Sequence, residues 1–148
     1  MTLIDTITED VIKVPLERTA KTEVIRELLD VLVAAGKVST PERALNALLE
    51  RESKGSTGLE AGIAVPHAKT DAVDSLAIAI GIASDGVDFQ ALDGQPSKLF
   101  FMLLAPPDQS GPHIEALSEI AKLTRSQAFL RALIGSKSAS EVMELLRD

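Results

Sequence analysis

Apolar positions in the first third of the chain follow a helical period. Over residues 19–35 they recur with the i, i+4, i+7, i+8 spacing of an amphipathic helix, at Val24, Leu28, Val31 and Leu32. Gly36 follows this segment and suits a C-terminal cap. The pattern therefore predicts a helix that packs one face against a core and ends at Gly36.

A second helix is predicted from Thr40 onward. Thr40 can cap it and Pro41 suits its first turn, because proline lacks only an N–H that the first turn leaves unpaired. Its apolar face is formed by Ala44, Leu45, Leu48 and Leu49. Arg51 and Glu52 then fall at or just beyond the last turn. Glu52 could orient a partner group there, but we expect it to be exposed.

The middle of the chain changes from spaced to continuous apolar positions. Three short runs, at residues 63–65, 76–83 and 99–105, are bounded by proline, glycine and aspartate, which is typical of strands. Unbroken apolar runs indicate strands buried on both faces, as in a sheet covered by helices on each side. Residues 84–96 supply turns between the last two strands, with room for one further short strand.

Three more helices are predicted after the turn-forming residues 106–111. The first begins at Pro112 and directs four residues toward the core, namely Leu117, Ile120, Ala121 and Leu123. The second covers residues 127–134, and the last is opened by Ser138, with Glu141 in a capping-box arrangement. The order of helices and strands predicts an α/β fold.

No internal repeat, low-complexity segment or linker marks a domain boundary in this chain. Its 148 residues, with 45% hydrophobic content, can build one hydrophobic core. We therefore expect a single α/β domain over residues 1–148, with its sheet sandwiched between helices.

Composition narrows the range of partners. The net charge is −7 and all aromatic residues are phenylalanine, so we expect no nucleic-acid binding. The absence of cysteine excludes disulfides, thiolate chemistry and sulfur-based metal sites. The N-terminal residues lack a signal-peptide pattern, and the longest apolar runs are far shorter than the roughly 20 residues that a membrane span needs. We expect a cytoplasmic protein without direct membrane insertion.

His67 is the most informative candidate for chemistry, because it follows directly on the apolar run of residues 62–66. Pro66 fixes its own φ and favours an extended Val65, so the imidazole is expected at a rigid strand exit. In helix-covered sheets, ligand sites gather at strand ends. A histidine that only caps a turn fits the same local sequence equally well.

Two further residues are suited to assist His67 with an anion. His113 follows Pro112 at the predicted start of a helix, where free N–H groups favour a bound anion and a neutral ring. Arg51 offers a planar, permanently charged group that matches phosphate oxygens. Each also has an ordinary interpretation, His113 as a solvated helix-start residue and Arg51 as a solvated or acid-paired arginine.

Motifs for metals and nucleotides are missing from the sequence. The two histidines are far apart, HExxH does not occur, and the aspartates within residues 85–93 do not follow a calcium-loop spacing. GxxxxGK[ST] is also missing, so there is no recognisable ATP phosphate loop. We expect no metal and no cofactor, and keep a small metal-dependent hydrolase as an alternative.

Phosphoryl transfer through a histidine fits these candidates. The nucleophile is a neutral imidazole nitrogen, which an ordinary histidine pKa of about 6.5 provides near neutrality. The transition state is loose and carries negative charge on its equatorial oxygens, so positioning and hydrogen-bond donors matter more than acid–base groups. Arg51 and His113 are the right kinds of donor for a group that His67 accepts.

Five segments of the chain carry a family resemblance. They lie at residues 51–52, 55–58, 62–68, 106–109 and 113–117. With them the chain resembles, over essentially its whole length, enzyme IIA of the bacterial phosphoenolpyruvate-dependent sugar phosphotransferase system. The class is the fructose/mannitol class, which includes the nitrogen-regulatory paralogues. The family fold is a mixed β-sheet sandwiched between helices, in line with the elements predicted above.

The resemblance implies a phosphotransferase component with a phosphohistidine intermediate. His67 corresponds to the histidine that accepts a phosphoryl group from the phosphocarrier HPr, or its nitrogen-branch counterpart, and passes it to a cysteine of a IIB domain. His113 matches the second active-site histidine, and Arg51 the arginine that helps hold phosphate. The alternative is a nitrogen-regulatory IIA protein whose phosphorylation state controls binding to regulatory partners.

Two smaller expectations concern the surface near His67. An apolar ring for the donor is expected from neighbours such as Ile63 and Ile114, and the acidic net charge suits a basic donor face. Glu60 stands where the family usually has glycine. Because a carboxylate beside the imidazole would oppose a phosphoryl group, we expect Glu60 to face solvent.

Overall fold

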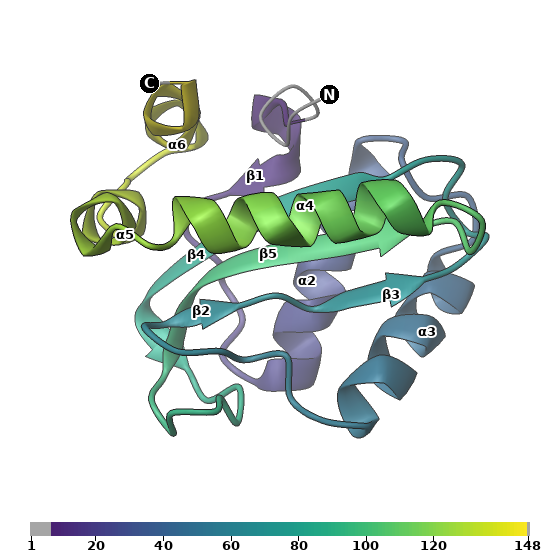
Figure 1. Ribbon diagram of the computed structural model, residues 1–148, viewed down its shortest axis with the longest axis horizontal. Coiled ribbons are helices and arrows are strands. Elements are labelled where there is room, and N and C mark those ends of the chain that lie inside the picture. The colour runs from purple at the N-terminus through teal and green to yellow at the C-terminus, as the bar shows by residue number, and fades with distance from the viewer. Residues whose placement is uncertain (1–6, 148) are drawn as a thin grey trace.

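Two long central strands organise the fold of residues 7–147, which the computed structural model describes (Figure 1). These strands, β4 (Ala77–Val87) and β5 (Ser97–Ala105), pair antiparallel. Three short strands flank them: β1 (Ile12–Lys13) is parallel to β4, and β2 (Ile63–Ala64) and β3 (His67–Lys69) are parallel to β5. Within the described residues this is a five-stranded mixed sheet in the order β1-β4-β5-β2, with β3 also on β5.

Helices cover both faces of this sheet, as the continuous apolar strands predict (Figure 1). One face carries α2 (Lys21–Ala34) and α3 (Pro41–Ser53), and the other carries α4 (Ser110–Leu123) and α5 (Gln127–Ile134). The last helix, α6 (Ala139–Arg147), packs against the short 3-10 helix η1 (Glu9–Val11) and β1. No helix among these described segments is long and apolar enough to cross a membrane.

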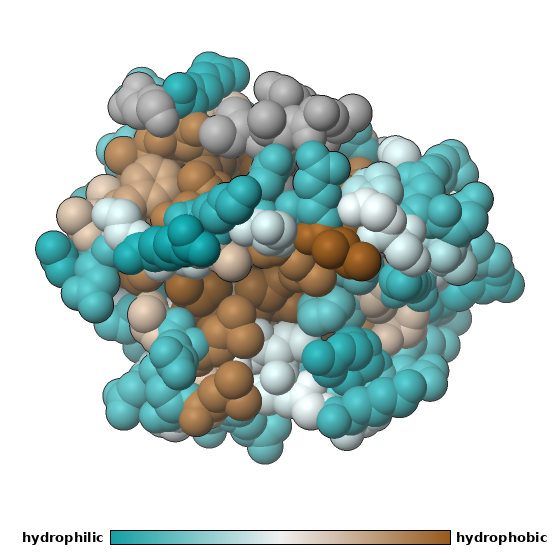
Figure 2. Space-filling model, in the orientation of Figure 1, coloured by the Kyte–Doolittle hydropathy of each residue, from teal (hydrophilic) through white to brown (hydrophobic). Residues whose placement is uncertain are grey.

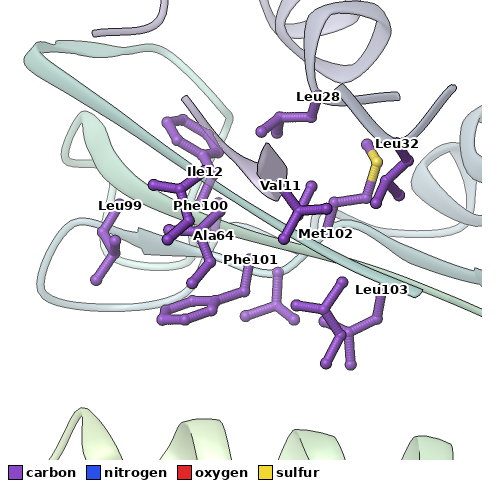
Figure 3. Packing of buried hydrophobic residues seen from close by; sticks show 14 of the residues in the cluster. Val11, Ile12, Leu28, Leu32, Ala64, Leu99, Phe100, Phe101, Met102 and Leu103 are labelled. Carbon is purple, nitrogen blue, oxygen red and sulfur yellow. The ribbon is translucent and has the colours of Figure 1, made fainter. Parts of the chain in front are cut away.

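The hydrophobic core lies on both sides of β5. Residues 99–105 of this strand are completely buried. Because side chains alternate across a strand, Phe100 and Met102 point toward α2, whereas Phe101 and Leu103 point to the opposite side (Figure 3). Each large apolar side chain buried in this way contributes about 1.5–3 kcal/mol, so β5 is the element that ties the two helical layers together.

Close packing of α2 on β4 depends on Gly81. A Cβ atom at this position would lie 2.8 Å from the side chains of Leu16 and Leu28, which is closer than real Cβ contacts allow. Glycine therefore lets the helix and the segment before it approach the middle of the strand.

The ends of the first and last helices follow the capping chemistry that the sequence predicts. Gly36 adopts a φ of 74° and closes α2 in a Schellman motif, in which Lys37 N–H donates to the Leu32 carbonyl oxygen at 3.0 Å. At α6, the hydroxyl of Ser138 accepts a hydrogen bond from Glu141 N–H at 3.2 Å. Gly36 and Ser138 thus lie at the two helix boundaries that the sequence predicts.

Several predicted boundaries are wrong. α2 begins at Lys21 rather than near residue 19, and α4 begins at Ser110 rather than Pro112. Ala121, predicted to face the core, is exposed, because the buried stripe of α4 is centred on other residues, namely His113, Ala116 and Ile120. β4 also extends past residue 83 to Val87.

Two short strands, β1 and β3, were not predicted from the pattern. Strands of two or three residues carry too few positions to show a period of two. They form because β4 and β5 offer free edges to pair with. β3 carries His67, the main candidate from the sequence analysis.

Candidate active site

His67 is the first residue of β3, directly after Pro66. The Pro66 carbonyl oxygen accepts a hydrogen bond from Leu103 N–H at 3.0 Å, which holds this segment on β5. His67 therefore opens a new short strand. This differs from the prediction, which placed it at the exit of a strand. Its Nδ1 lies 2.7 Å from the Val65 carbonyl oxygen, and because a carbonyl oxygen only accepts, Nδ1 carries the proton. In the neutral ring the free lone pair is then on Nε2.

His113 lies beside His67 despite their separation in sequence. It belongs to the N-terminal part of α4, which packs on β5, and β3 is hydrogen-bonded to that same strand. The centroids of the two imidazole rings are 5.4 Å apart, and the ring planes are inclined at 66°. The structure thus brings the two histidines singled out by sequence into edge contact.

Burial favours the neutral form of His113. Only 5% of the residue is exposed, and burial, followed by the charges of His67 and Lys69, lowers its pKa below the usual 6.5. Its Nε2 is buried and has no hydrogen-bond partner among residues 7–147. An unpaired buried nitrogen costs stability, so packing alone does not explain this residue.

Arg51 lies in the last turn of α3 and reaches the same place. Its Nη1 donates to the Gly55 carbonyl oxygen at 2.9 Å. Together with both histidines it lines a pocket of about 380 Å³, whose walls are Ala47, Glu50, Arg51, Lys54, His67, Ala68, Lys69 and His113. The three site residues predicted from sequence therefore share one pocket.

Positive charge gathers at this pocket although the chain as a whole carries −7. Of its three cations, Lys54 pairs with Glu50 at 3.8 Å. Arg51 and Lys69 have no carboxylate within ion-pair distance in the part of the chain that the structure describes. The N-terminal end of α4, with its positive dipole, lies at the same pocket. The pocket is thus electrostatically suited to an anion.

Lys69 is a pocket residue that sequence reasoning missed. It is two positions after His67 on β3, so both side chains leave the strand on the same face. Its Nζ donates to the hydroxyl of Ser110, the first residue of α4, at 2.7 Å. The spacing of two would have pointed to Lys69 if the strand had been predicted to continue past His67.

The side chain of Glu52 is buried, contrary to the expectation that it faces solvent. Its side chain is 6% exposed, and its carboxylate pairs with Lys21 Nζ at 2.9 Å. The same carboxylate accepts hydrogen bonds from Thr57, from the N–H at 3.1 Å and from the hydroxyl. Glu52 therefore ties the end of α3 to α2 and to the loop that follows Arg51.

The surface around the site partly matches the expected apolar ring. Ile114 is 65% exposed, and apolar surface is visible near this end of α4 (Figure 2). Ile63 is only 6% exposed because it pairs with β5, so its expected place in the ring is wrong. Glu60 is exposed, as expected, and the positive φ angles of this turn fall on Ala61 and Gly62.

A larger hollow, of about 590 Å³, lies along α2 and contains neither histidine. Its buried group is Glu27, which accepts hydrogen bonds from the N–H groups of Glu17 at 2.8 Å and Arg18 at 2.9 Å. Lys13 Nζ lies 3.0 Å from the same carboxylate. Burial alone would raise the pKa of Glu27, but these bonds outweigh it and lower the pKa. Its partners all come from the chain itself, which indicates a structural role.

The pocket of the two histidines can accept and hold an anionic group. Nε2 of His67 supplies a lone pair, Arg51 and Lys69 supply positive charge, and His113 supplies a neutral ring. Across residues 7–147, no three His, Asp or Glu side chains lie close enough together to hold a metal ion.

Known proteins with similar sequences and structures fall into one group. The family model "Phosphoenolpyruvate-dependent sugar phosphotransferase system, EIIA 2" matches residues 5–148. The chain is 38% identical over 148 residues to a fructose-specific EIIABC component of Bacillus subtilis, covering all of this chain and 23% of that protein. The chain thus spans about a quarter of that relative's length.

Two solved structures extend the similarity to the fold. The nitrogen regulatory protein IIA-Ntr of Neisseria meningitidis has a TM-score of 0.88 and 29% identity, covering 97% of this chain and 98% of that one. Enzyme IIA mannitol of Escherichia coli, in a complex with phosphorylated IIB mannitol, has a TM-score of 0.82 and 26% identity, covering 95% and 96%. The match over nearly all residues shows that this chain belongs to the EIIA 2 family of the phosphoenolpyruvate-dependent sugar phosphotransferase system.

Proposed function

We propose that this chain is a phosphocarrier that accepts a phosphoryl group on Nε2 of His67 and passes it on. The donor is an HPr-type phosphocarrier protein, and the acceptor is a IIB component of a fructose/mannitol-type sugar transporter. The observation that carries the proposal is the 2.7 Å hydrogen bond from His67 Nδ1 to the Val65 carbonyl oxygen. It selects the tautomer in which Nε2 is the nucleophile.

Transfer to His67 exchanges one phosphorus–nitrogen bond for another. The Nε2 lone pair forms the new bond while the bond to the donor imidazole breaks, and the electron pair of the broken bond returns to the donor nitrogen. Because the attacking nitrogen carries no proton, no general base is needed. In the second step a IIB cysteine thiolate forms a sulfur–phosphorus bond, and His67 recovers its lone pair.

Arg51 and His113 are proposed to hold the moving group. Negative charge gathers on the three equatorial phosphoryl oxygens in the transition state, and the guanidinium of Arg51 with the N–H groups at the start of α4 would meet it. His113, with its lowered pKa, would donate a neutral hydrogen bond. A neutral donor suits a carrier, because a very tightly held group would not be passed on.

The surroundings of His67 support transfer between folded proteins. His67 is half-buried in an open pocket, and the exposed Ile114 offers apolar contact beside it. Weak, transient encounters use small interfaces of this kind. The E. coli structure of IIA mannitol with phosphorylated IIB supports a IIB acceptor for this chain as well. We further propose that residues 1–148 act as one IIA unit in the cytoplasm.

Phosphorylation with purified components tests the proposal. Incubation with phosphoenolpyruvate, enzyme I and HPr should increase the mass of the chain by one phosphoryl group, with a label stable to base and labile to acid. His67→Ala should lose the label completely. A mutant that is labelled as well as the wild type would contradict the assignment of His67.

A second function is favoured by the similarity to IIA-Ntr of Neisseria meningitidis, which covers 97% of this chain. In that case the phosphorylation state of His67 would control binding to regulatory partners, and no IIB domain would accept the group. The pocket serves both functions equally.

Transfer from the phosphorylated chain to a panel of IIB domains separates the two functions. Rapid loss of the label to one fructose- or mannitol-type IIB domain supports sugar transport. Retention of the label with every IIB domain supports regulation.

A further inference from the structure

Lys69 is a cation at the pocket that the proposed function has not used. We propose that Lys69 is a further catalytic residue, whose ammonium group binds an oxygen of the phosphoryl group carried by His67. This inference rests on the proposed phosphocarrier function and adds one residue to those that bind the phosphoryl group.

The position of Lys69 relative to His67 is set by the sheet. Both residues belong to β3, which pairs in parallel register with β5, His67 opposite Leu103 and Lys69 opposite Ala105. Residues two apart on a strand project to the same side and lie about 7 Å apart along it. Lys69 therefore reaches the pocket from a rigid element, and the lysine stem is long enough to bring its ammonium toward a group on Nε2.

The partners of Lys69 leave it free to bind an anion. Its Nζ donates to the neutral hydroxyl of Ser110 at 2.7 Å. No carboxylate lies within ion-pair distance of Lys69 in the described residues, whereas Lys54, on the same pocket, pairs with Glu50. An ammonium has three donors, so two remain after the bond to Ser110.

The Ser110 hydroxyl gives Lys69 a defined place before the phosphoryl group arrives. Ser110 is the first residue of α4, and His113 follows in the same helix end, so the bond holds the ammonium close to both histidines. The charge of Lys69 also contributes to the lowered pKa of His113, which is consistent with this proximity. A charged oxygen binds an ammonium more strongly than a neutral hydroxyl does, so the bond would be exchanged on phosphorylation.

An ordinary explanation of Lys69 is protection of a sheet edge, because lysine on edge strands prevents unwanted strand pairing. That explanation requires only a positive charge that faces solvent. It does not account for an ammonium that lines the pocket of the two histidines and is bonded to the helix carrying one of them. The two explanations predict different results for phosphoryl transfer.

The test compares Lys69→Met with Lys69→Arg, which keeps the charge, and with Lys122→Met, an exposed lysine at the other end of α4. Each protein is phosphorylated by phosphoramidate, a small donor that needs no docking surface, and separately by phospho-HPr. With both donors, Lys69→Met should slow labelling of His67 about 10- to 100-fold. Lys69→Arg should recover most of the rate, and Lys122→Met should stay within about 2-fold of the wild type.

A second measurement reports on the contact itself. The pKa of the phosphoryl group on His67, followed by its ³¹P resonance as a function of pH, should rise by about one unit in Lys69→Met, because an opposite charge has been removed. Lys69→Gln repeats both measurements if the methionine variant folds poorly, as checked by circular dichroism.

Each outcome has a distinct meaning. Loss of labelling with both donors together with the ³¹P shift supports the inference. Normal labelling and an unchanged ³¹P titration in Lys69→Met overturn it, while a labelled wild type leaves the proposed function standing. Loss with phospho-HPr alone also overturns it, because Lys69 would then serve docking. If the wild type accepts no phosphoryl group from either donor, the proposed function itself fails.

Discussion

The two histidines of the site behave differently because their surroundings differ. His67 is half-buried, and its Nδ1 is satisfied by the Val65 carbonyl oxygen, which leaves Nε2 free. His113 is buried, and its Nε2 has no partner among the described residues. Burial and the nearby charges favour the uncharged form of His113, so its protonation is linked to the folded state.

The stability of the protein should therefore depend on pH through His113. Its pKa is lower in the folded protein than the ordinary value of about 6.5 in the unfolded chain. As the pH falls below that value the unfolded chain binds the proton first, so the free energy of unfolding decreases until the pH passes the folded pKa. Urea unfolding at about pH 7.5 and about pH 5.5 should show a smaller loss of stability in His113→Gln than in the wild type.

The two proteins differ only at residue 113, so the comparison isolates His113. Parallel pH dependence in His113→Gln and the wild type would contradict the linkage. A lower stability of the variant at both pH values, by a constant amount, would reflect packing alone.

At the scale of the elements, Glu52 joins three parts of the chain around Arg51. The carboxylate links α3 to Lys21 of α2 and to Thr57 in the loop that follows. Lys21 also lies 4.8 Å from the ring centroid of Phe89, just beyond β4. Because Arg51 bonds to Gly55 in that same loop, the ion pair fixes the backbone that holds the guanidinium.

Removal of the charge at Glu52 should destabilise the fold. Glu52→Gln leaves Lys21, whose side chain is 19% exposed, without its counter-ion, and we expect a loss of about 2 kcal/mol. Lys21→Met should cost a similar amount, and the double mutant less than the sum, because the two charges then disappear together. Urea unfolding of the four proteins measures the coupling, and strict additivity would contradict it.

On the scale of the whole molecule, the charge that gathers at the pocket is opposite in sign to the net charge of the chain. The chain carries −7 overall, yet the cations Arg51 and Lys69 face the pocket without carboxylate partners among residues 7–147. The acidic remainder would attract a donor protein with a basic face, and the local cations would receive its phosphoryl group. Under the proposed function, attraction of the donor and transfer of the phosphoryl group would involve different parts of the surface.

Salt should therefore slow transfer from a protein donor but not from a small one. Between ionic strengths of about 0.01 M and about 1 M the screening length falls from about 30 Å to about 3 Å, so long-range attraction is lost. The second-order rate of transfer from phospho-HPr should fall about 10-fold over this range. Labelling by phosphoramidate serves as the control, and an equal loss with both donors would argue against steering by charge.

Much of the architecture was predictable, because it follows from long apolar patterns. The central strands at residues 76–83 and 99–105 and the helices that flank them were predicted from continuous or periodic apolar positions. His67, His113 and Arg51 were identified as candidates from residue chemistry and from the family resemblance, and the fold brings them to one pocket.

Features that depend on distant partners were missed. β3 has too few residues to show a pattern, and for that reason Lys69 was overlooked. The burial of Glu52 depends on Lys21, which is far away in sequence, so no local property of the chain indicates it. Ile63 is hidden by its pairing with β5, which is again a tertiary effect.

The position of α6 against η1 places both ends of the described residues at one edge of the sheet. η1 and α6 lie beside β1 at one edge of the sheet, whereas His67 lies on β3 at the opposite edge (Figure 1). A tether attached near residue 7 or residue 147 would consequently leave the imidazole uncovered. A protein that docks at His67 would therefore not meet such a tether at its point of attachment.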